Sequence, residues 1–184
     1  MKPIKVSTKI KPCGQTIHAI GDDFCYCIRP IEKNDKERLI ALFNQISPQN
    51  RYLRFAHAIS KLPDQFLQDV LELDYTMEMA LVAFLNESDK NGEIIGIARY
   101  VSDDTGNTCE FSITVSDQYS AHGVGMNLMG RLIEYAKHNK LQKMIGYILN
   151  SNVKMLRMTR ELGFQIDSLA NESEFKIATL DLQK

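Results

Sequence analysis

Hydrophobic and polar positions in the middle of the chain predict a strand followed by a helix. Between Phe111 and Ser116, apolar and small polar residues alternate, which is the period of a half-buried β-strand. Apolar residues then recur at every fourth position from Val124 to Ala136, so one face of a helix over residues 123–139 is apolar. A glycine-rich turn with the sequence SAHGVG joins the two elements.

The same patterns, broken by proline, glycine and asparagine, predict the remaining elements. Strands are expected at residues 16–20, 24–31, 79–85, 93–101, 144–149, 164–169 and 175–181. Helices are expected at 34–46 with Asn34 as N-cap, at 49–58, at 63–73, and at 152–162, where Gly163 ends the last one. Residues 1–14 are expected to be a flexible N-terminal arm with at most a short edge strand, and residues 15–184 a single domain.

Composition is that of an ordinary globular protein and suggests no charge-driven partner. The 184 residues are 44% hydrophobic and 24% charged. A formal net charge of −1 gives no electrostatic reason to expect nucleic acid or an anionic membrane as a partner. No apolar run approaches the ~20 residues needed to span a bilayer, and no secretory signal follows the N-terminal lysines.

The four cysteines and four histidines show no metal-binding pattern. Cys25 and Cys27 would share one face of a strand, which makes them poor disulfide partners. We therefore expect reduced thiols, a cytoplasmic protein and no bound metal.

The glycine turn is the first candidate for a binding site. Gly123 and Gly125 let the backbone bend sharply at a helix N-terminus, where unpaired N–H groups and the helix dipole attract an anion such as a pyrophosphate. Close packing of the helix on the strand would explain both glycines equally well. Leu128 stands where a Rossmann fingerprint requires glycine, and the chain has no G-K-[ST] triplet of a P-loop.

The turn and the segment that follows it resemble a known family. S-A-H-G-V-G before an amphipathic helix is similar to motif A (Q/R-x-x-G-x-G/A) of the GNAT N-acetyltransferases, which bind acetyl-CoA there. Asn152, Met155, Leu156 and residues 162–164 then resemble the family's N-x-x-M-L…L-G-F segment. Ser120 departs from the motif, because the family usually has Gln or Arg at that position.

A closer resemblance is to the GNAT domain of bacterial protein-lysine acetyltransferases, which silence acyl-CoA synthetases. The chain has patterns like theirs at residues 52–55, 74–83, 96–99 and 110–111, and the likeness extends over about residues 29–164. It implies an α/β (α+β) GNAT fold, a central mixed but mostly antiparallel sheet flanked by helices. It also implies a splayed pair of strands that binds acyl-CoA.

The resemblance implies where acetyl-CoA, the expected cosubstrate, would bind. Backbone groups of Ile113, Thr114 and Val115 would pair with the pantetheine amides. Asn152 would contact the pantetheine arm, although a helix N-cap explains this residue as well. Backbone N–H groups around the glycine turn would hold the pyrophosphate, at Ser120, Ala121, His122, Gly123, Val124, Gly125 and Met126.

Acetyl transfer to an amine also needs a base, because a lysine with an ordinary pKa of ~10.4 is protonated at neutral pH. Glu110 stands at the position of the catalytic glutamate in the resembled enzymes, and apolar neighbours could desolvate it. Alternatively it is a cross-strand partner of Arg99 or a solvent-facing residue. Thr159 replaces the tyrosine that acts as an acid in many GNAT enzymes, and a thiolate leaving group with a pKa near ~8.5 needs little such help.

The resemblance also implies that the segment between the first strand and the second lies over the acceptor side of the cleft. Tyr52, Arg54 and Phe55 are the candidate substrate contacts there. The alternative is that the aromatic rings pack in the core and Arg54 forms a salt bridge.

Three functions are compatible with these residues. The first is an acetyl-CoA-dependent N-acetyltransferase acting on a protein lysine, with an acyl-CoA synthetase as the implied partner. The second is a small-amine acetyltransferase of the same fold, and the third is a non-catalytic acyl-CoA sensor. The length leaves no room for a fused regulatory domain, so regulation in cis is not expected.

Overall fold

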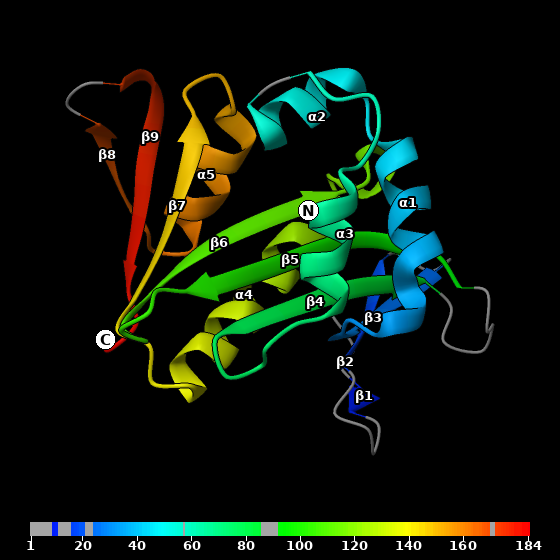
Figure 1. Cartoon of the computed structure of the whole chain (residues 1–184), viewed down its shortest axis with the longest axis horizontal. Coiled ribbons are helices and arrows are strands. Elements are labelled where there is room, and N and C mark those ends of the chain that lie inside the picture. Colours follow the sequence, from blue (N-terminus) through cyan, green and yellow to red (C-terminus); the bar gives the residue numbers. More distant parts are fainter. Residues whose placement is uncertain (1–8, 11–15, 21–23, 57, 86–91, 170–171) are drawn as a thin grey trace, which may run out of the picture.

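A nine-stranded sheet runs through the molecule in the order β1-β2-β3-β4-β5-β6-β7-β9-β8 (Figure 1). The computed structural model describes residues 9–10, 16–20, 24–56, 58–85, 92–169 and 172–184. Neighbouring strands are antiparallel except for the parallel pair β6–β7. The predicted mixed, mostly antiparallel sheet is therefore confirmed. Its strands are β1 Lys9–Ile10, β2 Thr16–Ile20, β3 Phe24–Pro30, β4 Glu78–Leu85, β5 Ile94–Ser102, β6 Thr108–Val115, β7 Lys143–Leu149, β8 Gln165–Leu169 and β9 Glu172–Asp181.

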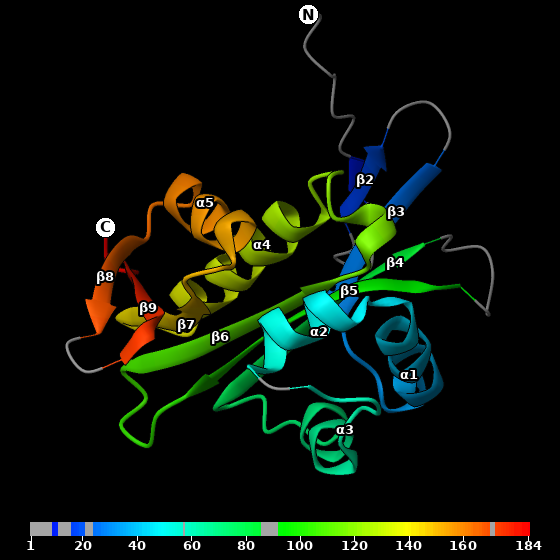
Figure 2. The ribbon, with the colours of Figure 1, turned by 90° about the horizontal axis from the view of Figure 1, so that it is seen from above.

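Helices cover both faces of the sheet, as Figure 2 shows. On one face lie α1, α2 and α3, and on the other lie α4 and α5. Each predicted helix is present, with its ends displaced by a few residues. The bounds are α1 Lys36–Gln45, α2 Pro48–Phe55, α3 Asp64–Leu71, α4 Val124–His138 and α5 Val153–Glu161, with short 3-10 turns at η1 Lys33–Asp35 and η2 Asp117–Tyr119.

The start of α1 differs from the sequence prediction, in which Asn34 was the N-cap. The chain first makes the turn η1, in which Glu32 and Asp35 cap each other. The Glu32 N–H donates to Asp35 Oδ2 over 2.9 Å. Asn34 lies exposed inside this turn, so its prediction as a cap is wrong. A reciprocal pair satisfies two free N–H groups, whereas a lone asparagine satisfies one.

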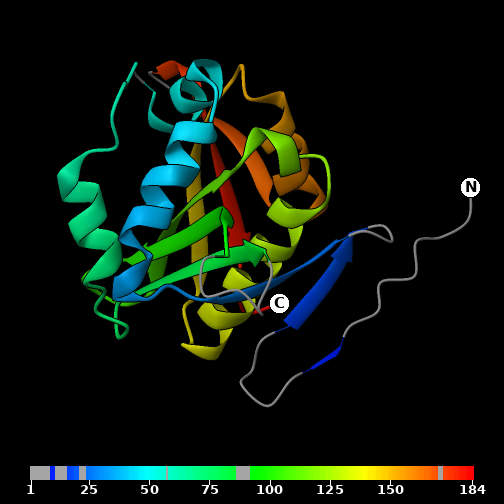
Figure 3. The ribbon, with the colours of Figure 1, turned by 90° about the vertical axis from the view of Figure 1, so that its right-hand side faces the viewer.

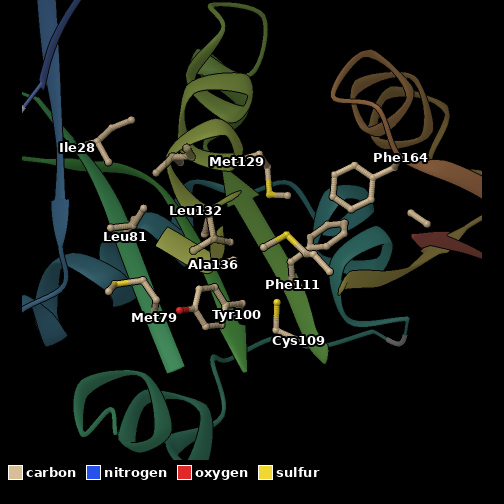
Figure 4. Close-up of a cluster of buried hydrophobic side chains, with 14 of the residues drawn as sticks. Ile28, Met79, Leu81, Tyr100, Cys109, Phe111, Met129, Leu132, Ala136 and Phe164 are labelled. Atoms are coloured by element: carbon tan, nitrogen blue, oxygen red, sulfur yellow. The ribbon is translucent and has the colours of Figure 1, made fainter. Parts of the chain in front are cut away.

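Two apolar cores fix the sheet between its helical layers. The larger core lies between the sheet and α4, and Figure 4 shows part of it. There the rings of Phe111 and Phe164 meet edge to face, with centroids 5.2 Å apart. A Cβ on Gly146 would lie 2.4 Å from the Phe111 ring, so only glycine fits beside it. The smaller core, with Leu42, Phe43 and Val82 among its residues, lies under α1 and α3.

The N-terminal strands lie at one edge of the sheet, away from the helical layers (Figure 3). β1 pairs with β2 over two positions, which agrees with the short edge strand allowed by the sequence. The rest of the predicted flexible arm lies outside the described residues. Among the described helices, none is both long and apolar enough to cross a membrane.

Candidate active site

The sheet opens between β6 and β7. These two strands pair only from Thr108 to Glu110, opposite Lys143 to Ile145. Beyond that point β6 continues to Val115 and β7 to Leu149, and the two strands diverge (Figure 1). Between Phe111 and Val115, the backbone groups of β6 that face away from β5 therefore have no strand partner among the described strands. Ile113, Thr114 and Val115, the residues predicted to bind pantetheine, lie along this open edge.

The glycine turn presents a set of main-chain donors. Gly123 is the N-cap of α4 and has a left-handed backbone with φ of +76°. In the described part of the chain, the N–H groups of Gly123, Val124, Gly125 and Met126 make no hydrogen bond. Four free donors at a helix N-terminus form a site for a phosphate or pyrophosphate. The geometry of the turn thus fits the diphosphate of coenzyme A.

The residues just before these donors are used differently from the sequence prediction. The N–H of His122 donates to the Tyr119 carbonyl oxygen at 3.2 Å, so the turn itself uses this donor. The hydroxyl of Ser120 donates to the Asp117 carbonyl oxygen at 3.1 Å. Ser120, Ala121 and His122 are all exposed. Among the described residues the run of four consecutive free donors therefore begins at Gly123, while the N–H groups of Ser120 and His122 are used within the turn.

Asn152 and Thr159 lie on α5, which follows β7. The Asn152 side chain accepts a hydrogen bond from the Met155 N–H at 3.2 Å, so it is the N-cap of α5. Thr159 is buried, and its hydroxyl donates to the carbonyl oxygens of Met155 and Leu156. Because that hydroxyl is engaged inside the helix, Thr159 does not present an acid to the cleft.

Glu110 lies at the last paired position of β6, where the opening begins. Its side chain is exposed, so the expected desolvation by apolar neighbours is wrong. The alternative role as partner of Arg99 is also wrong, because Arg99 Nη2 donates to Glu78 Oε2 at 2.6 Å. An exposed carboxylate at the mouth of the opening is placed to exchange a proton with an incoming amine or with water.

The three predicted acceptor-side residues have separate environments on α2. Tyr52 is 45% exposed. Phe55 packs between Phe43 and Phe66, with ring centroids 6.2 and 6.1 Å away, so its role in the core is clear. For Arg54, the described residues provide neither an ion pair within 4.0 Å nor a hydrogen bond to its guanidinium. The predicted alternative of a salt bridge is therefore not what holds this residue.

Arg54 lies in an electrostatically strained environment. The side chain as a whole is only partly buried, but its guanidinium lies among protein atoms. Burial lowers the pKa of Arg54 to about 10, the Glu110 carboxylate acts in the opposite direction, and the Arg99 guanidinium lowers it further. Arg54, Arg99 and Glu110 therefore form one charged group next to the open edge of β6.

Asp117 was not identified from the sequence, although it links two parts of the site. Its carboxylate accepts hydrogen bonds from the Ser47 N–H at 3.1 Å and the Asn50 side chain at 2.7 Å. Ser47 is the N-cap of α2, and Asp117 begins the turn η2 before the glycine loop. Partial burial works against ionisation, but these hydrogen bonds outweigh it and lower the pKa of Asp117. Its partners are 70 and 67 positions away, so no local sequence signal marks the contact.

A sheet that opens beside a glycine turn, with a carboxylate at the mouth of the opening, fits a protein that binds an acylated coenzyme A. The GNAT acetyltransferase domain family matches residues 26–165. An acetyltransferase of Pseudomonas aeruginosa is 30% identical over 148 residues, which are 80% of this chain and 79% of that protein. The chain belongs to the GNAT acetyltransferase family and is an acetyl-CoA-dependent N-acetyltransferase.

Other relatives cover less of their own length or of this chain. Acetyltransferase Pat of Mycolicibacterium smegmatis is 29% identical over 139 residues, which are 75% of this chain but 40% of that protein. The L-methionine sulfoximine/L-methionine sulfone acetyltransferase of Pseudomonas paraeruginosa is 34% identical over 83 residues, 43% of this chain and 48% of that protein.

Solved structures share the fold at low sequence identity. The GNAT domain of S. lividans PAT has a TM-score of 0.81 at 20% identity, covering 94% of this chain and 99% of that domain. YncA of Salmonella typhimurium, solved with its cofactor acetyl-CoA, has a TM-score of 0.65 at 21% identity, covering 86% of this chain and 95% of that one. The GNAT fold expected from the sequence is therefore confirmed.

Proposed function

We propose that the chain transfers the acetyl group of acetyl-CoA to the side-chain amine of a protein lysine, with Glu110 as the general base. The observation that carries the proposal is the position of the Glu110 carboxylate, exposed where β6 leaves β7. The resemblance of residues 29–164 to bacterial protein-lysine acetyltransferases, described above, supports a protein acceptor. An acyl-CoA synthetase is the candidate partner, and we place the reaction in the cytoplasm.

An open groove beside Glu110 supports a lysine-bearing acceptor. It is lined by Gln68, Asp69 and Glu72 of α3 and by Glu78, Arg99 and Val101 of the sheet. Val101 is the register partner of Glu110 on one side and of Glu78 on the other, so the groove adjoins the proposed base. Glu78 is paired with Arg99, so the Asp69 and Glu72 carboxylates are the ones that would attract the positive charge of a lysine that approaches Glu110.

The proposed reaction is a direct transfer, in which this chain binds and orients acetyl-CoA and accepts a proton from the amine. The N–H groups from Gly123 to Met126 would hold the diphosphate, and the open edge of β6 would hold the pantetheine amides. Glu110 would accept, directly or through one water, the proton that the amine loses as its nitrogen attacks the thioester carbon. The C–S bond breaks, the acetyl group remains on nitrogen, and coenzyme A leaves as a thiolate.

The test is acetylation of cellular proteins by the purified protein with labelled acetyl-CoA. We expect a labelled protein band with the wild type. Glu110→Gln should lose about 10²- to 10⁴-fold in kcat, the usual contribution of a general base, while coenzyme A still binds. Glu134→Gln is the control, because this exposed glutamate on α4 pairs, within the described residues, with Arg131 of the same helix. Equal rates for wild type and Glu110→Gln would contradict the assigned base.

A small amine is the second candidate acceptor. The relative that acetylates L-methionine sulfoximine and L-methionine sulfone, named above, favours it. Labelled small products in the absence of any labelled protein band would support this candidate over a protein lysine.

A further inference from the structure

Two arginine side chains of the acceptor side line one small pocket behind the open edge of β6. Arg54 comes from the last turn of α2 and Arg99 from β5. Ser112 and Thr114 of β6 line the same pocket, and Ile97 and Phe66 form its apolar wall. Arg99 pairs in register with Ser112, and Ile97 with Thr114, so these four side chains belong to one face of the sheet.

The positive charge of this pocket is incompletely balanced within the described residues. One Arg99 nitrogen, Nη2, donates to Glu78, but Nε is buried without a partner. Arg54 has the Glu110 carboxylate as its attractive neighbour through space, yet no hydrogen bond joins the two side chains. A guanidinium presents up to five donors in a planar fork, and a buried donor without a partner is costly.

The pocket itself, about 10 Å³, has room for about one water molecule. We propose that a carboxylate of the acceptor binds at its mouth, held by Arg54 and supported by Arg99, while the acceptor amine faces Glu110. This rests on the proposed function, because it takes the amine to be at Glu110. A planar carboxylate matches the guanidinium fork in a bidentate arrangement, and it would supply the hydrogen bonds that Arg54 lacks. Burial and the repulsion from Arg99 lower the pKa of Arg54, and a bound carboxylate would offset both effects.

The proposal defines a class of acceptor, an amine with a carboxylate within a few ångströms. Two sources present that chemistry. One is the α-carboxylate of a free amino acid, and the other is an aspartate or glutamate next to the target lysine of a protein. The acidic groove along α3 and the arginine pocket would then recognise the two opposite charges of the same acceptor.

The binding test does not depend on turnover. Propionate and its neutral isostere propionamide are added, at matched ionic strength, to protein saturated with coenzyme A, and the unfolding temperature is measured. We expect propionate to raise it in the wild type and in Lys61→Gln, a control that removes an exposed cation paired with Asp64. Propionamide should have no effect, and Arg54→Gln should abolish the response to propionate. Equal responses to both ligands, or an undiminished response in Arg54→Gln, would overturn the proposal.

The kinetic test identifies the source of the carboxylate. Acceptors are compared in pairs that differ only in that group, namely L-methionine sulfone with its carboxamide, and a Lys-Asp peptide with a Lys-Asn peptide. We expect one pair to show a preference of roughly 10- to 100-fold in kcat/KM for the carboxylate, the size of hydrogen bonds to a charged group. Arg54→Gln should remove the preference, and Arg54→Lys should retain part of it.

The acceptor pair that shows the carboxylate preference identifies the acceptor as a free amino acid or as a protein lysine. The absence of a preference in both pairs would overturn the assignment of the pocket to the acceptor. Failure of the general-base proposal is separate, since it appears as unchanged turnover in Glu110→Gln and leaves the propionate result intact.

Discussion

Gly123 shows how one backbone conformation prepares the cofactor site. Its φ of +76° lies in the left-handed region, where a side chain is disfavoured, although a Cβ there would meet no atom within 4 Å. The constraint at this position is therefore conformational and not steric. If the backbone relaxed toward negative φ, the free N–H groups that follow Gly123 would change direction.

Substitution of alanine at two glycines of the same region should have opposite effects. We expect Gly123→Ala to lower the free energy of unfolding by about 1–2 kcal/mol, the cost of a left-handed residue, and to weaken coenzyme A binding. Gly130 lies in the interior of α4, and a Cβ there would have open space around it. Gly130→Ala should therefore raise the free energy of unfolding by about 0.5–1 kcal/mol. Urea unfolding of both variants measures this. Changes of the same sign would show that left-handed strain is not the reason for glycine at 123.

Between elements, Asp117 connects the cofactor loop to the acceptor helix. Its carboxylate receives the N–H of the α2 N-cap residue Ser47 and the side chain of Asn50. This contact fixes the start of α2 relative to the strand that carries Glu110. Since α2 also carries Arg54, the contact sets the position of the acceptor-side residues.

Removal of the Asp117 carboxylate should weaken binding of the acceptor more than binding of acetyl-CoA. We expect Asp117→Ala to lower the free energy of unfolding by about 1–3 kcal/mol, because charge-assisted hydrogen bonds are lost. The KM for the acceptor should rise while the KM for acetyl-CoA changes less. Asp104→Ala, an exposed residue of the β5–β6 turn, is the control. An unchanged acceptor KM in Asp117→Ala would show that α2 needs no such link.

Asp35 ties β3 to α1 through a buried ion cluster. Its side chain is 0% exposed and accepts from Arg29 at 2.7 and 2.9 Å and from Arg38 at 3.0 Å. Burial works to raise the pKa of Asp35, but these hydrogen bonds and that of the Glu32 N–H outweigh it and lower the pKa below its ordinary value. Because the pKa of Asp35 is lower in the folded chain than in the unfolded chain, the ionised carboxylate stabilises the fold at a pH above the pKa of the unfolded chain. This stabilisation is lost as the pH falls through the pKa of the folded chain.

Asp35→Asn should therefore destabilise the protein at neutral pH but not in strong acid. We expect a loss of about 3–5 kcal/mol at pH 7, because two partly buried arginines lose the Asp35 carboxylate as an ion-pair partner. The difference from wild type should shrink as pH falls below the ordinary carboxyl range. Urea unfolding across pH measures it, with Asp64→Asn, a surface pair with Lys61, as control. A difference that persists at low pH would argue against ionic stabilisation.

For the whole molecule, the cofactor should act as a stabiliser. Coenzyme A at about 100 times its dissociation constant would add about 2.7 kcal/mol, which corresponds to a rise of roughly 5–10 °C in Tm for a chain of this size. Differential scanning fluorimetry measures this, and Glu110→Gln should respond like the wild type, because Glu110 is assigned to proton transfer. No rise in either protein would contradict the assigned cofactor site.

The fold could be predicted from the sequence because its elements depend on local periodicity. The alternation in β6 and the four-residue repeat in α4 both correspond to elements in the structure. The turn was located from Gly123 and Gly125 alone. What remained uncertain was which of its N–H groups are free, because the turn's own hydrogen bonds decide that.

Choices between distant partners could not be read from the sequence. Glu78 and Glu110 lie in the same cross-strand row, opposite Val101, and both flank Arg99. The strand period predicts the same face of the sheet for both glutamates and does not distinguish them. In the structure Arg99 pairs with Glu78, and Glu110 is exposed. Burial of Glu110 failed as a prediction for the same reason, because it depends on where α2 and α3 pack and not on neighbours in the chain.

The divergence of β6 from β7 leaves an unsatisfied strand edge in the interior of a sheet and not at its rim. Open strand edges are templates for pairing with other polypeptides, and so for self-association. A pantetheine arm lying along β6 would occupy that edge. Molecules depleted of coenzyme A should consequently aggregate faster than loaded ones, and the supply of this metabolite would then affect how long the enzyme stays dispersed as well as how fast it works.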